Sequence, residues 1–156
     1  MPKYRLLSLE ELNELEKEFV DFLVLNSILP ADWEQLKNDG KADPVIEQFS
    51  EVVFETIMRK VEFLEWFEEK EIKTFQCLPD KLVVVGLNAG PDSEINFSDM
   101  SLLRTAFQNP PGDLKVYTSE KAYSKERERE LFDMIEAGCT ISDGKLFKSL
   151  CVALKA

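Results

Sequence analysis

The carboxylates that follow residue 91 are the side chains best placed for chemistry in this sequence. Asp92, Glu94 and Asp99 fall close together, and carboxylate oxygens are the ligands that Mg²⁺ and Ca²⁺ prefer. Their spacing imitates the first half of a calcium-binding loop. However, Phe97 stands where such a loop needs glycine, and Leu103 stands where it needs a bidentate glutamate. We therefore predict a solvated loop and no metal site, and keep these three carboxylates as the candidates for a divalent cation.

The other side chains that carry most enzyme chemistry are few. The sequence has no histidine, which removes the commonest general base, the Ser–His and Cys–His pairs and histidine ligands for zinc. Cys77, Cys139 and Cys151 are too far apart in the chain for a local zinc site, and their spacing fits a reducing compartment. We expect all three to be buried small apolar residues, and keep a reactive thiol at Cys139 as the alternative.

A glycine-containing segment at residues 82–90 is the one candidate for nucleotide binding. The apolar residues 82–85 lead into Gly86, as a strand leads into the turn of a dinucleotide-binding unit. The glycine spacing then fails, because Asn88 and Pro91 occupy the next two glycine positions of that motif. No phosphate-binding loop occurs elsewhere, so we predict a buried strand and no cofactor.

Charge limits the partners of the chain. The 156 residues carry a net charge of −11, and residues 1–71 hold 18 acidic but only 8 basic residues. Such a surface repels nucleic acid and the anionic face of a membrane. The longest apolar stretches have four residues, far below the roughly 20 that cross a bilayer, and the first residues do not resemble a signal peptide. We predict a cytoplasmic protein that binds neither nucleic acid nor membranes.

One basic cluster interrupts this acidity. Glutamates at 126, 128 and 130 alternate with its cations, at spacings that allow ion pairs along a helix. We interpret the cluster as the solvated face of a helix at residues 124–137. Its members are Lys121, Lys125, Arg127 and Arg129.

Two helices are predicted at the N-terminus. Ser8 and Glu11 have the types and spacing of a capping box, in which each side chain accepts a hydrogen bond from the other's backbone amide. Apolar residues recur at helical spacing from there for about 18 residues, until Asn26 and Pro30 end the pattern. Residues 31–38 form a short second helix.

The longest periodic segment predicts a central helix over residues 44–68. Its apolar arc is wide, so we expect neighbours to bury it on two sides. A narrow polar strip runs along the remaining face, and Trp66 falls within that strip on a helical projection. An indole in a polar strip indicates either cover from the following turn or contact with another protein.

The second half of the chain predicts strands followed by helices. Residues 71–77 and 81–87 flank Pro79-Asp80, which suits a tight turn, and so form a hairpin. A third strand over 114–118 follows a short helix at 101–108, and helices at 124–137 and 145–154 end the chain. The fold class is therefore α+β, with a three-stranded antiparallel sheet packed on the long central helix. We find no linker, and predict one domain over residues 1–156.

Three segments resemble an uncharacterised family of short acidic proteins from Bacteroidetes-type bacteria, a domain of unknown function. They are Tyr-Arg-Leu-Leu-Ser-Leu-Glu-Glu-Leu at residues 4–12, Phe-Ser-Glu-Val-Val-Phe-Glu at 49–55 and Ile-Ser-Asp-Gly-Lys-Leu-Phe at 141–147. The resemblance covers nearly the whole chain. It implies a bacterial origin and no particular activity.

Two functions remain open. The first is a non-enzymatic interaction or regulatory module, favoured because no nucleophile, general base or phosphate loop is present. Its predicted contact surface, for a protein partner or a second copy of the chain, comprises Trp66, Glu51, Glu55, Glu62 and Glu69. The alternative is a small enzyme that uses carboxylates and a metal ion, through Asp92, Glu94 and Asp99.

Overall fold

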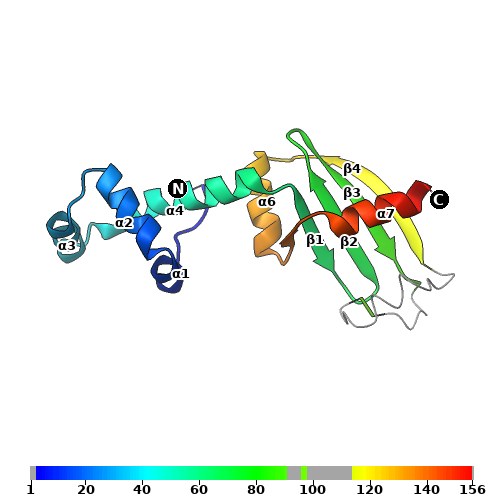
Figure 1. The fold of residues 1–156 in the computed structure, drawn as a ribbon, viewed down its shortest axis with the longest axis horizontal. Helices are drawn as coiled ribbons and strands as arrows, with labels where there is room; N and C mark the ends of the chain where they lie inside the picture. The colour runs from blue at the N-terminus through cyan, green and yellow to red at the C-terminus, as the bar shows by residue number, and fades with distance from the viewer. Residues whose placement is uncertain (1–2, 91–95, 98–113, 156) are drawn as a thin grey trace. The chain divides into compact units, whose positions relative to one another are not determined.

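The computed structural model describes residues 3–90, 96–97 and 114–155, and it is an α+β protein (Figure 1). The chain divides into two compact units, Met1–Arg59 and Lys60–Ala156, which we call unit 1 and unit 2 and describe separately. Unit 1 is helical, and unit 2 holds the sheet. The expectation of one domain over residues 1–156 stays a prediction.

Four helices make up unit 1. The Ser8 and Glu11 capping box is confirmed, with backbone amide to side-chain oxygen distances of 3.2 and 2.9 Å. The predicted helix of about 18 residues is broken at Leu15, where φ is −106° and ψ is 25°. The short second helix is confirmed. The elements are α1 (Leu9–Glu14), α2 (Glu16–Leu25), α3 (Pro30–Asn38) and α4 (Ala42–Lys60).

Aromatic side chains form the centre of unit 1. The ring of Phe49 on α4 lies 4.9 Å from that of Phe19 and 5.3 Å from that of Phe22, both on α2. The N-terminal segment packs on α4, because Leu7 is buried and its amide donates to the Ser50 hydroxyl at 2.9 Å. Ser50 in turn donates to the carbonyl of Ile46, so its buried hydroxyl is satisfied.

Over the part of unit 2 that the structure describes, the sheet is antiparallel and has five strands. The hairpin and the third strand are confirmed, and the third strand pairs with the hairpin's second arm, but the expected number of three strands is wrong. The strand order is β4-β3-β2-β1-β5. The strands are β1 (Phe63–Phe67), β2 (Glu71–Cys77), β3 (Lys81–Asn88), β4 (Lys115–Ala122) and β5 (Thr140–Ser142).

The predicted central helix over residues 44–68 is wrong in its last third. Helix α4 ends at Lys60, and Phe63–Phe67 is strand β1, which pairs with both β2 and β5. Its sequence, Phe-Leu-Glu-Trp-Phe, is rich in aromatic residues that suit a pleated surface covered on both sides. Two neighbouring strands therefore decide the conformation of a segment whose apolar residues are also compatible with a helix.

Helix α7 (Lys145–Lys155) covers one face of the sheet (Figure 1). Phe147 and Leu150 of α7 join Ile72, Val85 and Leu87 in a buried cluster. Because side chains alternate along a strand, the intervening residues face the other side, where α6 (Arg127–Glu136) contributes Met134. No helix among the described residues has the length and apolar character needed to cross a membrane.

Candidate functional site

The metal-binding candidates of the sequence, Asp92, Glu94 and Asp99, lie outside the described residues. The short helix expected at 101–108 lies outside them as well. The structure therefore leaves the metal prediction as it stood.

The predicted contact strip does not lie on one helix. Glu51 and Glu55 are on α4, whereas Glu62 precedes β1 and Glu69 lies between β1 and β2. The helical geometry that aligned these carboxylates with Trp66 ends at Lys60. Their role in partner binding stays a prediction, but it needs support other than a shared helix face.

Trp66 is a strand residue that packs within unit 2. Its indole nitrogen donates to Glu68 at 2.8 Å, and its side chain is half-buried. Gly138 lies under the ring, and a Cβ added there would come within 2.8 Å of Trp66 Cζ3. Gly138 also has a φ of 126°, which L side chains rarely adopt, so only glycine fits this contact. The ring thus has an intramolecular partner, and its placement in a polar helix strip is wrong.

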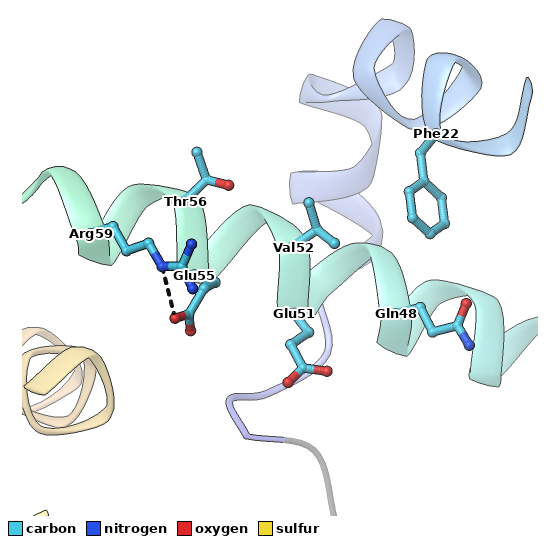
Figure 2. A pocket seen from close by; sticks show the side chains of 7 residues that line it. All are labelled: Phe22, Gln48, Glu51, Val52, Glu55, Thr56 and Arg59. Atoms are coloured by element: carbon cyan, nitrogen blue, oxygen red, sulfur yellow. Dashed lines mark hydrogen bonds and ion pairs between the residues drawn. The ribbon is translucent and has the colours of Figure 1, made fainter. Parts of the chain in front are cut away.

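Unit 1 carries a groove between α2 and α4, which we call the α2–α4 groove (Figure 2). Its volume is about 440 Å³. Phe22 and Val52 provide apolar surface, and the Val52 side chain is 52% exposed. The polar residues around them are Gln48, Glu51, Glu55, Thr56 and Arg59.

The two carboxylates of the α2–α4 groove differ in their surroundings. Glu55 accepts hydrogen bonds from Lys3 at 2.7 Å and Tyr4 at 2.5 Å, and Arg59 donates to it at 3.2 Å. Burial raises the pKa of Glu55, but these bonds outweigh burial and hold the pKa below its usual value. Glu51 is exposed and has no ion pair with any described residue. Glu51 is therefore the carboxylate that is available to a cation from outside.

Unit 2 carries a second groove, on the sheet face opposite α7, which we call the sheet groove. Its volume is about 630 Å³. Strands β2, β3 and β4 form its floor, and α6 adds Met134. It is lined by Glu71, Lys73, Phe75, Leu82, Val84, Asn88, Tyr117, Ser119, Lys121 and Met134.

The Tyr117 ring is held in place across the sheet groove. Tyr117 is paired with Gly86 in the register of β3 and β4, and a Cβ on Gly86 would lie 2.3 Å from Tyr117 Cζ. The ring therefore occupies the space that a side chain at residue 86 would fill. The Tyr117 hydroxyl donates to Glu71, and burial together with this bond raises the tyrosine pKa. Tyr117 is thus a fixed, neutral wall of the groove.

Lys73 is the cation at the centre of this face. It lies in β2, in register with Trp66 of β1 on one side and Gly86 of β3 on the other, and it is half-buried. Lys73 makes no ion pair or hydrogen bond with any described residue, whereas Lys121 at the groove's edge pairs with Glu130 at 3.4 Å. A half-buried lysine that pairs with no described residue is a binding element for an anion.

The start of α6 contains contacts that the sequence did not indicate. Arg127 belongs to the cluster expected to be a solvated face, yet only 14% of its side chain is exposed. Its guanidinium donates to the carbonyls of Val61 at 2.5 Å, Cys77 at 3.0 Å and Leu78 at 3.2 Å. Arg127 therefore joins α6 to the β2–β3 turn and to the start of β1.

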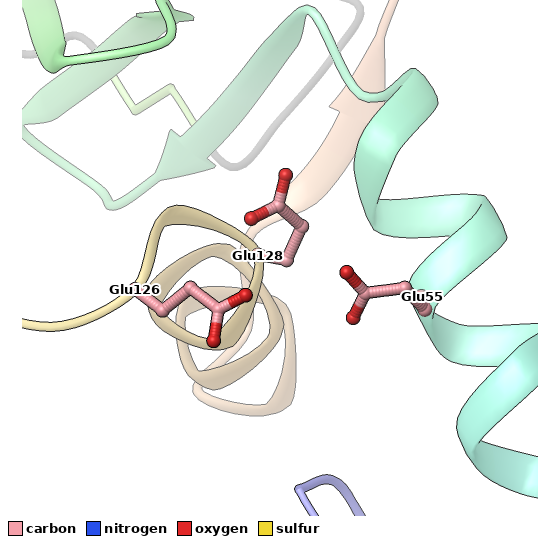
Figure 3. Close-up of side chains that lie close together, drawn as sticks. All are labelled: Glu55, Glu126 and Glu128. Carbon is pink, nitrogen blue, oxygen red and sulfur yellow. The ribbon is translucent and has the colours of Figure 1, made fainter.

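The acidic residues of α6 also take different roles. Glu126 precedes the helix and Glu128 lies in its first turn (Figure 3), where carboxylates interact favourably with the helix dipole. Glu130 is 5% exposed and accepts from the amide and the hydroxyl of Ser124, at 3.1 and 3.0 Å. These bonds satisfy a buried carboxylate, which makes it a structural group. Glu55, which Figure 3 also draws, belongs to unit 1 and is described above.

The cysteines have no disulfide partner, and two of them are buried. Burial raises the pKa of Cys77 to about 12 and also raises the pKa of Cys139. The thiolate of Cys139 is therefore scarce at neutral pH, which opposes the alternative of a reactive thiol. Cys151 is half-buried on α7.

The chain belongs to DUF6495, a family of unknown function, whose model matches residues 1–155. This match confirms the expected resemblance to an uncharacterised family. No curated protein and no solved structure matches the chain.

Proposed function

We propose that this family member is a non-enzymatic interaction module, and that unit 1 binds an amphipathic, basic segment of another protein along α2 and α4. One observation carries the proposal: apolar side chains are exposed mainly on the helical unit. Of the eleven large hydrophobic side chains that are exposed among the described residues, eight belong to unit 1. They are Leu6, Leu9, Val20, Val24, Leu25, Leu29, Val52 and Ile57. Concentrated apolar exposure is typical of a surface that another molecule covers.

Charge supports a basic partner. Unit 1 carries 13 acidic and 6 basic residues, a net charge of −7. Lys3, Arg5, Lys37 and Arg59 already pair with carboxylates of the same unit. Glu51 at the α2–α4 groove pairs with none of the described residues, so lysine or arginine side chains at the edge of an apolar segment would find complementary charge there.

Peptide binding tests the proposal. Two labelled helical peptides of about 18 residues, a length that matches the 19 residues of α4, would share their leucine positions and differ only in carrying lysine or glutamate elsewhere. Fluorescence anisotropy with the full chain should show tighter binding of the lysine peptide, weakened by salt. Val52→Lys should weaken this binding by about tenfold, because it places a cation on the exposed apolar floor of the groove.

A matched variant gives the control. Val152 on α7 is also exposed, so Val152→Lys makes the same change in unit 2 and should leave peptide binding unchanged. Equal affinity for the lysine and glutamate peptides would refute the basic partner. If light scattering showed a dimer that Val52→Lys dissociates, the partner would be a second copy of the chain and the basic partner would be refuted.

A further inference from the structure

We propose that the sheet groove of unit 2 is a binding site for a small organic anion, with an apolar body on the sheet and one negative charge at Lys73. This site lies outside unit 1 and uses none of the residues proposed to bind a protein partner. It rests on the shape of the groove, its apolar floor and one half-buried lysine that pairs with no residue that the structure describes.

The floor of the sheet groove accounts for the apolar body. Phe75 of β2 and Val84 of β3 are paired in the register and are both half-buried, so they present a continuous apolar surface. Met134 borders this surface from α6, and the Tyr117 ring borders it from β4. The volume of about 630 Å³ falls within the range of roughly 300 to 1,000 Å³ that is usual for small-molecule sites.

The position of Lys73 accounts for the charge of the ligand. Its neighbour on the same face of β2, Glu71, accepts the hydrogen bond of Tyr117, and no described residue pairs with the Lys73 ammonium. A carboxylate, sulfonate or phosphate on a bound molecule would supply the missing counterion within a partly apolar site, where an ion pair is less screened than in water.

The surrounding charges limit the ligand to a small anion. Glu71 lines the groove, and the charge of Glu68 contributes to the raised pKa of Tyr117, so both carboxylates lie near the site. Unit 2 has a net charge of −4. A nucleic acid strand would need several cations in succession, whereas Lys121 is paired with Glu130. A ligand with a single anionic group bound at Lys73 needs no further cation.

Two fluorescent probes test the site on the full chain. 1-Anilinonaphthalene-8-sulfonate and N-phenyl-1-naphthylamine share the same aromatic body, and only the first carries a sulfonate. The sulfonate probe should bind more tightly, and Lys73→Met should weaken it by about tenfold while changing the affinity of the neutral probe less than about twofold. Methionine keeps an apolar stem of similar length, so this variant removes the charge and little of the packing.

A charge-matched control and a position readout complete the experiment. Lys148→Met removes the same charge from α7, on the opposite face of the sheet, and should leave both affinities unchanged. In a Trp33→Phe background Trp66, which is in register with Lys73, should transfer energy to the bound probe. Val84→Glu should weaken both probes. If Lys73→Met and Lys148→Met have equal effects, or if Val84→Glu changes neither affinity, the site is refuted.

Discussion

Arg127 should stabilise unit 2 through its contacts with backbone carbonyls, and replacing it with methionine measures this contribution. The variant keeps a long apolar stem and removes the donors to the carbonyls of Val61, Cys77 and Leu78. A hydrogen bond from a charged donor contributes about 1.5 to 3 kcal/mol. Three bonds to one guanidinium are not additive, and water reaches the partly exposed site, so we expect a loss of about 3 kcal/mol.

Urea unfolding in a Trp33→Phe background measures this loss, because the fluorescence of Trp66 then reports on unit 2 alone. With an m-value of about 2 kcal/mol/M, a loss of about 3 kcal/mol lowers the midpoint by about 1.5 M. The corresponding fall in melting temperature is about 10 °C or more for a unit of this size.

Arg129→Met is the matched control. Arg129 is on the same helix and is 37% exposed, with an ion pair to Asp133 at 3.4 Å. Exposed pairs contribute about 0 to 1 kcal/mol, so this variant should unfold near the wild-type midpoint. Equal losses for the two variants, or a loss below about 1 kcal/mol for Arg127→Met, would refute the assigned role of the three carbonyl contacts.

Three further outcomes are expected. Hydrogen bonds from Arg5 and from the Ser8 amide lower the pKa of Glu11 from 4.5 to about 2. The ionised Glu11 side chain therefore stabilises the fold fully above about pH 4.5, and this stabilisation is lost as the pH falls through about 2. Glu11→Ala should therefore lower the free energy of unfolding by about 1 kcal/mol at neutral pH, since the site is partly exposed. The difference in urea midpoint between this variant and wild type should shrink as the pH falls from about 4.5 to about 2, whereas the difference between Glu10→Ala and wild type should not. A disulfide reagent at neutral pH should react first with Cys151, since burial raises the pKa of Cys77 and Cys139. If the fast phase of the thiol reaction disappeared in Cys139→Ser and remained in Cys151→Ser, this prediction would be wrong. Titration with millimolar Mg²⁺, Ca²⁺ or Mn²⁺ should leave the melting temperature unchanged, whereas a concentration-dependent rise that is abolished by substituting Asp92, Glu94 and Asp99 would support the metal-dependent enzyme.

Local signals in the sequence were sufficient for most elements. The Ser8 and Glu11 capping box, the turn at Pro79-Asp80 and the last two helices depend on residues close together in the chain. Each signal has a short-range physical basis, such as a side chain that satisfies a free amide or a proline that sets φ. The α+β class followed from the order of these elements.

The end of the long helix depended on tertiary structure. Residues 63–67 are apolar on both sides, which fits a buried helix and a central strand equally well. Pairing with β2 and with β5, which begins 73 residues after β1 ends, selects the strand. Because that choice moved Trp66 from a helix to a strand, the contact surface predicted around it lost its geometric basis.

The grooves also arise from contacts that are distant in sequence. Tyr117 covers Gly86 only because β3 and β4 are in register, and Glu71, which shares a face of β2 with Lys73, accepts the Tyr117 hydrogen bond, while Lys73 pairs with no described residue. Arg127 was predicted as a solvated cation from its charged neighbours, but the folded chain brings three carbonyl groups to it. The sequence by itself determined the acidity of unit 1, the absence of histidine and the local caps, since these depend on composition and near neighbours. Only the tertiary structure decided which charged side chains are partnered, because their partners lie up to 66 residues away.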